Sequence, residues 1–505
     1  MPEHLRALIV VLVLAGAAWI VTQPSVARAT SAATAQQWRN WWFGFTVVAF
    51  AVGSFWLYAA IVAIVLLAQR LKPIDALAAY CLLLFAVPAA TVDIPGFGLI
   101  NYFFTLSQPR LLALLLLAPA TLALARQPGR VRLGSTLPDK LLLGYVLLAA
   151  VLQLRASNFT STLRGCFYLV TDVLLIYYVA SRAPQQPSDL RRVLQAYVMA
   201  AALLGILSVF ETLRHWNLYS AMVSTLGLGW GTTGYLSREG LLRANGSVGQ
   251  AIVLGYVSAV GLGLWLALQE GQRRTLRNLA PALLMGGGLL AALSRGPWVG
   301  AVAVLLAFLW TGRNRVQNIA KLGVAGIAGL GLLSLFGAGQ KILSFLPFIG
   351  TVDSGNVSYR QRLLDNALIV IDRNFWLGSV DYRQTPEMQS MIQGQGIIDI
   401  VNTYLGVALN YGIIGLALFA GFFIVILWQL WRTQTRLAMD SELRTMGRSL
   451  LATFFAIALM ISSVSTIVVV AQVFWLVAGF AVAWLGLMAS KRPIGKIPAQ
   501  PVSAG

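Results

Sequence analysis

The chain has 505 residues, of which 58% are hydrophobic and only 11% are charged, whereas soluble globular domains carry roughly 25% charged residues. This composition excludes an ordinary soluble enzyme, a disordered chain and a fibrous protein, and it leaves a polytopic membrane protein. Cys81 and Cys166 are the only cysteines and both lie in apolar runs, so a disulfide framework is excluded. With only His4 and His215 available, we expect no metal site built on histidine.

Fourteen apolar stretches approach the length that crosses a membrane, which is about 20 residues. In chain order they are 5–21, 43–68, 74–90, 111–125, 139–152, 165–180, 193–210, 247–268, 279–293, 297–310, 319–337, 412–430, 449–463 and 466–489. We therefore predict an all-α polytopic membrane protein with about 12–14 transmembrane helices.

The net charge of +20 predicts the orientation of these helices rather than a nucleic-acid partner, because basic residues concentrate in cytoplasmic loops. With the N-terminus in the cytoplasm, basic clusters such as 126–132, 273–277 and 432–448 all fall on the cytoplasmic side. Both termini are then cytoplasmic. A competing interpretation takes the first apolar stretch as a signal peptide that is cleaved near Ala27-Arg28-Ala29.

Two long loops, 211–246 and 338–399, fall on the periplasmic side. Loops of this length are usually functional or disordered, and the aromatic residues in both favour function. Residues 358–372 have the apolar spacing of an amphipathic helix. We divide the chain into N-terminal helices with the first long loop (1–240), a core that includes the second loop (241–430), C-terminal helices (431–490) and a disordered cytoplasmic tail (491–505).

Two arginines on this side lie beside the ends of apolar runs. Arg243 lies in Leu242-Arg243-Ala244-Asn245-Gly246-Ser247, where glycine and serine would let an anion approach the N–H groups at a helix start. Arg295 follows Ser294 between two apolar runs with almost no loop, so it lies at the membrane boundary, where arginines usually face a cavity or a partner. The plainer interpretation of each is an anchor at the membrane interface.

A third basic segment, Tyr359-Arg360-Gln361-Arg362, opens the amphipathic helix. Here the alternative is a solvated face with weak ion pairs, such as Arg362 with Asp365. Asp172 lies in the middle of an apolar helix, where a carboxylate indicates either a functional site, such as a proton relay in a transporter, or a bond to a neighbouring helix.

These arginines favour a diphosphate ligand at the membrane surface, because arginine binds phosphate through a planar fork. A lipid-linked sugar diphosphate is such a ligand, and arginines stabilise its leaving group without a metal. We therefore predict that Arg243, Arg295, Arg360 and Arg362 bind the diphosphate and that no metal or other cofactor takes part. An acceptor hydroxyl needs a general base. Among the outer carboxylates, Asp399 is favoured by its position at the end of the long loop, just before Asn402 and Tyr404, which we assign to the glycan.

Four segments occur in an order that resembles a known family. They are Leu242-Arg243-Ala244-Asn245-Gly246, then Ser294-Arg295-Gly296-Pro297-Trp298, then Tyr359-Arg360-Gln361-Arg362-Leu363 with Asn374-Phe375-Trp376-Leu377-Gly378, and finally Val401-Asn402-Thr403-Tyr404-Leu405 with Tyr411-Gly412-Ile413-Ile414-Gly415-Leu416. Over about residues 240–430 the chain resembles the O-antigen ligase and polymerase superfamily of bacterial inner membranes. Each motif is weak alone, whereas their order and spacing are specific.

The sequence departs from the family pattern at two places. The family's Asn-Pro-x-x-Gly segment has Phe375 or Trp376 in place of its proline. The family's ligases carry a histidine before the asparagine, and this chain has Val401 there. The missing histidine puts the general base in doubt, makes Asp399 the replacement we favour, and favours a polysaccharide polymerase over a lipopolysaccharide ligase.

The resemblance implies a metal-independent, inverting glycosyltransferase of the bacterial inner membrane. It would take oligosaccharide repeat units from undecaprenyl diphosphate at the periplasmic face and extend an exopolysaccharide, a capsule or an O-antigen. Its partners would be that lipid-linked oligosaccharide, membrane lipid, and proteins that regulate chain length or export the polymer. The alternatives are an O-antigen ligase, which transfers glycan to a lipid acceptor, and a flippase for the lipid-linked unit. The flippase is disfavoured because only Asp172 is clearly in mid-membrane.

Overall fold

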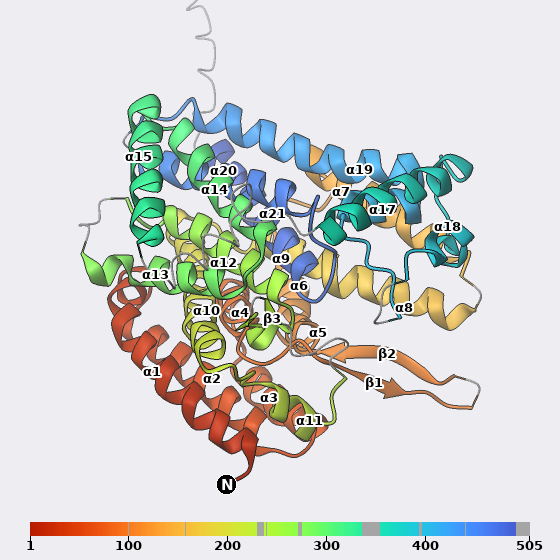
Figure 1. Cartoon of the computed structure of the whole chain (residues 1–505), viewed down its shortest axis with the longest axis horizontal. Helices are drawn as coiled ribbons and strands as arrows, with labels where there is room; N and C mark the ends of the chain where they lie inside the picture. Colours follow the sequence, from red (N-terminus) through yellow and green to blue (C-terminus); the bar gives the residue numbers. More distant parts are fainter. Residues whose placement is uncertain are drawn as a thin grey trace, which may run out of the picture.

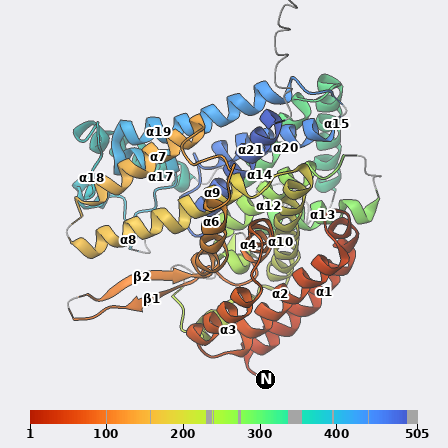
Figure 2. The ribbon, with the colours of Figure 1, turned by 180° about the vertical axis from the view of Figure 1, so that it is seen from behind.

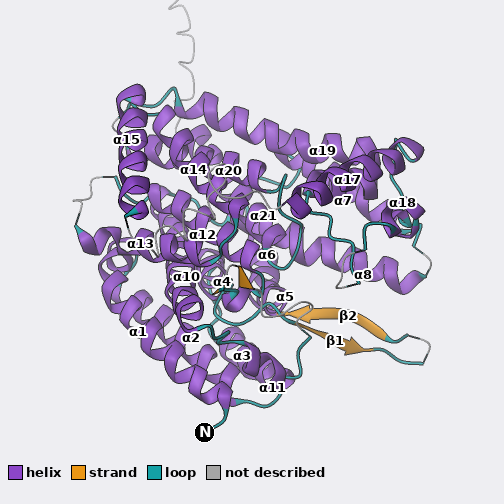
Figure 3. Ribbon diagram, in the orientation of Figure 1, coloured by secondary structure: helices purple, strands orange, loops and turns teal. Residues whose placement is uncertain are grey.

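The computed structural model describes residues 1–98, 100–156, 158–229, 237–238, 240–270, 275–335, 354–392, 396–439 and 441–490. Helices make up most of this part of the chain (Figure 3). The tail 491–505, which the sequence predicts to be disordered, lies outside the described residues, as do Trp230, Tyr235, Phe345 and Phe348 of the long loops.

The elements follow one another as shown in Figure 1. The first half holds α1 (Glu3–Ala29), α2 (Ala32–Ala51), α3 (Phe55–Ala68), α4 (Pro73–Leu83), strands β1 (Thr91–Pro95) and β2 (Tyr102–Ser107), α5 (Gln108–Leu112), α6 (Ala118–Ala125), α7 (Leu137–Gln153), α8 (Phe159–Leu169), α9 (Leu175–Arg182), α10 (Pro187–Arg214) and α11 (Ser220–Thr225). The second half holds strands β3 (Ser237–Arg238) and β4 (Leu241–Leu242), then α12 (Ala251–Leu266), α13 (Leu276–Ala291), α14 (Arg295–Trp310), α15 (Arg315–Ser334), α17 (Ser354–Arg373), α18 (Pro386–Gln389), α19 (Thr403–Gln434), α20 (Glu442–Met460) and α21 (Val470–Ser490).

The helices confirm the predicted fold class. Seven are long and apolar enough to cross a membrane, and five shorter apolar helices accompany them in the described part of the chain. Two of the seven continue through a π-helical turn, one at Ala113–Leu117 between α5 and α6 and one at Val170–Leu174 between α8 and α9. The strands form two small antiparallel hairpins, and the β1–β2 hairpin projects beside α8 in both views (Figures 1 and 2).

The N-terminus corrects the predicted topology. The apolar run 43–68 is not one helix, because it comprises the end of α2 and the whole of α3 with a break at 52–54 between them. The Trp216 indole N–H donates to the Glu3 carboxylate at 3.0 Å, which puts the N-terminus on the same side as loop 211–229. The prediction that these two segments lie on opposite sides is therefore wrong.

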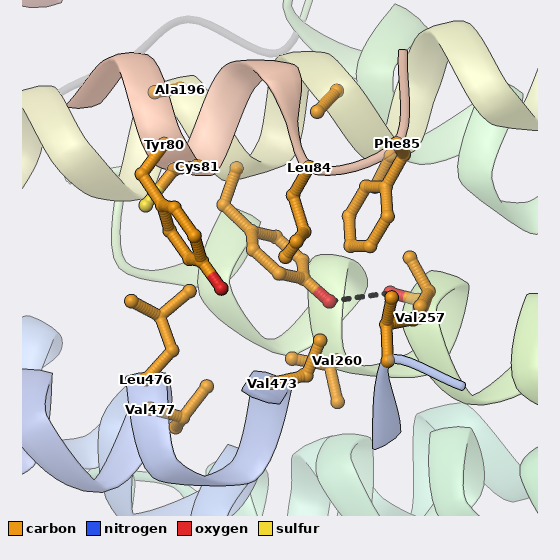
Figure 4. Close-up of a cluster of buried hydrophobic side chains, with 14 of the residues drawn as sticks. Tyr80, Cys81, Leu84, Phe85, Ala196, Val257, Val260, Val473, Leu476 and Val477 are labelled. Atoms are coloured by element: carbon orange, nitrogen blue, oxygen red, sulfur yellow. Dashed lines mark hydrogen bonds between the residues drawn. The ribbon is translucent and has the colours of Figure 1, made fainter. Parts of the chain in front are cut away.

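The core of the bundle surrounds α10, most of whose residues are buried. In Figure 4, Tyr80 of α4 and Phe85, two residues past the end of α4, face side chains of α12 and α21, namely Val257, Val260, Val473 and Leu476. Helices α10 and α13 approach so closely that a Cβ on Gly205 would lie 2.2 Å from the carbonyl oxygen of Leu284. Small residues allow such contacts between membrane helices, where packing rather than the hydrophobic effect drives association.

A second, smaller core joins α17 and α18 to the start of α19. Leu363, Ala367 and Val370 of α17 are buried against Leu405 and Leu409, which confirms the amphipathic helix predicted at 358–372. At its edge the Arg373 guanidinium lies 2.6 Å from Glu387. A hydrogen bond from the backbone N–H of Glu387 lowers the pKa of the Glu387 carboxyl most, and the contact with Arg373 lowers it further.

Helix α19 is broken at Gly412, whose φ of 65° and ψ of −165° are not helical. The segment after α17 fills the break, because the N–H of Ile413 donates to the carbonyl of Phe375 at 2.8 Å and the N–H of Ser379 donates to Leu409 at 2.8 Å. A Cβ on Gly412 would lie 2.3 Å from the Trp376 carbonyl oxygen, so only glycine fits. The Asn374–Gly378 and Tyr411–Leu416 motifs are therefore one structural unit.

Candidate functional site

The Arg243 segment is held by a buried carboxylate at the end of α10. Glu211 is 1% exposed, and its two oxygens accept from the backbone N–H groups of Leu218 at 3.0 Å, Asn245 at 3.1 Å and Gly246 at 2.8 Å. Gly246 has a φ of 52°, and a Cβ there would lie 2.5 Å from Leu204. The sequence predicts that backbone N–H groups here bind an external anion, but the Glu211 carboxylate already accepts hydrogen bonds from two of them, those of Asn245 and Gly246.

The Arg295 turn lies directly beside this segment. The N–H of Ala244 donates to Ala291 at 3.1 Å, and Arg243 Nε reaches the Ala292 carbonyl at 3.5 Å. Arg295 is the first residue of α14 and is half-buried. Leu293, two residues before it, has a φ of 45°, which is rare for a non-glycine residue. Contacts of this kind bring the first two predicted arginine segments together, and the strained turn is typical of a functional site.

Asp399 is connected to the Arg295 turn through the loop between α20 and α21. Its Oδ1 accepts from Ser465 Oγ at 2.6 Å, and Ser463 of the same loop lies 3.0 Å from where a Cβ on Gly296 would be. Val468 of this loop has a φ of 50°, a strained value for a β-branched residue. The Asp399 side chain is half-buried and its second oxygen accepts no hydrogen bond from the described residues, so a carboxylate oxygen remains for a ligand.

The two predicted glycan residues have internal partners. Asn402 caps α19, with its Oδ1 accepting from the N–H groups of Tyr404 at 2.9 Å and Leu405 at 3.2 Å. The Tyr404 hydroxyl donates to the Ala458 carbonyl at 2.9 Å. These bonds fix the start of α19 beside Asp399, and they engage the groups that a sugar would otherwise contact. Both side chains therefore position the site in this structure.

Arg360 and Arg362 project from the exposed side of α17. Tyr359, between the two in angle, donates its hydroxyl to the Asp399 carbonyl at 3.1 Å, so the start of α17 lies at the site. Two residues apart on a helix differ by about 200° in direction. The two arginines consequently point to different sides, and a single diphosphate is in reach of one of them rather than both.

Sequence reasoning missed Arg155, which clamps the helix break. It follows α7, which lies alongside α19 in both views (Figures 1 and 2). Its guanidinium donates to the carbonyls of Leu377 at 3.1 Å, Gly378 at 2.9 Å and Asn410 at 3.3 Å. No motif marks it, because its role depends on a packing contact between segments more than 200 residues apart.

Asp172, for which the sequence left two interpretations, bonds a neighbouring helix. Arg110 Nη2 lies 2.8 Å from Asp172 Oδ2, and its guanidinium stacks over the Tyr168 ring at 3.8 Å. Arg110 also donates to the Thr105 carbonyl at 2.9 Å. The structure favours the structural interpretation of this carboxylate, because a paired charge is compensated inside the membrane region.

The described residues contain no group of three or more His, Cys, Asp or Glu side chains that could hold a metal ion. The chemistry available at the site is that of guanidinium groups, a half-buried carboxylate and the hydroxyls of Ser465 and Tyr359. This set suits anion binding and proton transfer from a hydroxyl.

Comparison with known proteins gives two matches. Residues 280–420 match the family model described as O-antigen ligase. Over 334 residues, 64% of this chain and 73% of the relative, the chain is 27% identical to a protein of Pseudomonas aeruginosa named O-antigen ligase. Both matches support the assignment of this chain to the O-antigen ligase and polymerase superfamily. Together with the apolar helices, the matches indicate an integral membrane protein that resembles glycosyltransferase-like enzymes.

The superfamily match covers α13, the Arg295 turn, α17, the helix break and the start of α19. It therefore spans Arg295, Arg360, Asp399 and the half of α19 that carries Asn402 and Tyr404. The Arg243 segment precedes the matched range, and its hydrogen bonds to α13 join it to the same region.

Proposed function

We propose that this superfamily member is a polysaccharide polymerase at the periplasmic face of the bacterial inner membrane. It transfers oligosaccharide repeat units from undecaprenyl diphosphate onto a growing lipid-linked glycan. The observation that carries the proposal is the adjacency of the Arg243 and Arg295 turns to each other and, through the α20–α21 loop, to Asp399.

The chemistry follows from these groups. Asp399 takes the proton of the acceptor hydroxyl, whose oxygen attacks the anomeric carbon of the donor sugar. The bond between that carbon and the diphosphate oxygen breaks, with inversion at the carbon. Arg243 and Arg295 stabilise the charge that develops on the departing lipid diphosphate, which is the part of the reaction that gains most from fixed cations.

Two features support a general base at Asp399. Val401 stands where the resemblance places the ligases' histidine, so another proton acceptor is needed nearby. Asp399 lies two residues away, and Ser465 and the helix cap at Asn402 hold its position. In inverting reactions of sugars a single carboxylate commonly activates the attacking oxygen.

An O-antigen ligase is the second candidate, and the relative from Pseudomonas aeruginosa carries that name. The two activities share donor and leaving group and differ in the acceptor. A flippase is less well supported, because the charged side chains Asp172 and Arg110 pair with each other.

The test is a strain that lacks the protein, in which lipid-linked glycans and finished polysaccharide are analysed together. We expect single repeat units without long polymer. Long polymer that remains on undecaprenyl diphosphate would contradict the polymerase and indicate the ligase. Repeat units confined to the inner leaflet would indicate the flippase instead.

A further inference from the structure

A cavity of about 550 Å³ lies between helix ends on the other side of the molecule from the arginine turns. It is lined by the start of α7 and the ends of α9, α19 and α21. A neighbouring cavity of about 500 Å³ shares Val131, Ser181 and Arg182 with it. Their size is in the range of ligand pockets, which is roughly 300–1,000 Å³.

The lining of the larger cavity combines arginines with apolar side chains. Its charged residues are Arg182, Arg432 and Arg436, and the residues that line it include no Asp or Glu. The apolar residues of the lining include Leu137, Trp428, Val482, Leu485 and Ala489. An amphiphile with an anionic head matches this combination.

The three arginines differ in how their charge is compensated. Arg182 is 4% exposed and lies 2.5 Å from the buried carboxylate of Asp139. Arg432 stacks over Trp428 at 5.3 Å. Both Arg432 and Arg436 are exposed, and neither side chain forms a hydrogen bond or ion pair within the described residues. The charges of Arg432 and Arg436 are thus uncompensated, whereas Asp139 neutralises the charge of the buried Arg182.

We propose that this cavity binds the headgroup of an acidic glycerophospholipid from the cytoplasmic leaflet. The cavity adjoins the basic loops, and basic loops mark the cytoplasmic side. Guanidinium groups take a phosphodiester through paired N–H donors, and basic pockets between membrane helices on this side hold anionic headgroups. The acyl chains continue along the apolar residues of the lining, beside Trp428. The site is independent of the proposed glycosyl transfer.

The experiment reconstitutes the full chain in nanodiscs of equimolar phosphatidylethanolamine and phosphatidylglycerol with identical acyl chains. Native mass spectrometry then counts the lipids that remain bound. The wild-type protein retains phosphatidylglycerol in preference. The double variant Arg432→Gln/Arg436→Gln loses that preference by about 30-fold, since each arginine that lines the cavity and contacts the headgroup contributes roughly a fivefold factor.

Arg315→Gln is the matched control. Arg315 stacks over Trp310 at 5.3 Å, as Arg432 does over Trp428. Trp310 and Trp428 are each 54% exposed, and Arg315 does not line the cavity. We expect this variant to retain phosphatidylglycerol as the wild type does.

Three results would overturn the proposal. They are unchanged phosphatidylglycerol retention in the double variant, an equal loss in Arg315→Gln, and displacement of the lipid by millimolar inorganic phosphate, which would make the site one for free phosphate. Because both substituted side chains are exposed, the variant keeps its fold, and its unfolding temperature in detergent without added lipid checks this.

Discussion

The arginines at the candidate site stand in two contrasting settings. Arg243 and Arg295 lie on adjoining turns that buried contacts hold in place, among them the Glu211 carboxylate and the N–H of Ala244. Arg360 and Arg362 lie on the exposed side of α17 and point in different directions. The first pair is fixed before a ligand arrives, whereas the second pair must be ordered by it. Fixed charges stabilise a transition state far better than mobile, solvated ones.

The largest expected effect belongs to the carboxylate beside the fixed pair. Asp399→Asn keeps the side-chain shape and removes the base, so transfer of a purified lipid-linked repeat unit slows by about 10²–10⁴-fold. Asp365→Asn, on the exposed side of α17, is the matched control and leaves the rate unchanged. Equal rates for Asp399→Asn and the wild type would remove Asp399 from the chemistry.

Arg295→Ala comes next, with a loss of about 10²–10³-fold in the same rate, because one fixed donor to the leaving diphosphate is gone. Arg295→Lys recovers part of the activity, since an ammonium supplies charge without the planar fork. The control is Arg214→Ala, an exposed arginine at the end of α10. A similar loss in that variant would point to general surface charge instead of a site.

Glu211→Gln tests whether the fixed pair depends on its support. The amide keeps the size of the side chain and places a donor among the N–H groups of Leu218, Asn245 and Gly246. We expect the free energy of unfolding to fall by about 1–3 kcal/mol. We also expect a roughly tenfold loss of activity, mostly as a higher KM for the lipid-linked donor. Thermal unfolding and steady-state kinetics measure the two parts, and full activity in a destabilised variant would contradict the positioning role.

The smallest effects are expected on α17. Arg360→Ala and Arg362→Ala are compared at low and high salt, and one of them lowers activity by up to about fivefold while the other has no effect. The effect shrinks at high salt, because exposed charges are screened. Equal, large and salt-independent losses in both variants would erase the contrast between the two settings.

The sequence predicts the fold class and the two arginine turns because both leave local signals. Apolar runs mark helices, and Gly246 and Gly296-Pro297 mark turns at their ends. The prediction of the N-terminal topology is also wrong for a local reason. Val52-Gly53-Ser54 separates two helices, whereas hydropathy alone joins residues 43–68 into one span.

The supports of the site leave no such signal. Glu211 contacts the Arg243 segment only after α10 packs against it. Arg155 contacts the break in α19 through Asn410, which is 255 residues away in the sequence. The Asn374–Gly378 and Tyr411–Leu416 segments stand out as motifs, yet only the structure reveals that one docks into the other. The internal bonds of Asn402 and Tyr404 are equally invisible in the sequence.

The most direct test of the central claim uses the double variant Arg243→Ala/Arg295→Ala, expressed at the wild-type level in the strain that lacks the protein. Its lipid-linked glycans and finished polysaccharide are separated by length. The account predicts single repeat units on the lipid carrier and no long polymer, whereas Arg360→Ala/Arg362→Ala in the same strain gives polymer of nearly normal length and yield. Wild-type polymer from the Arg243→Ala/Arg295→Ala variant would contradict a diphosphate site at these turns.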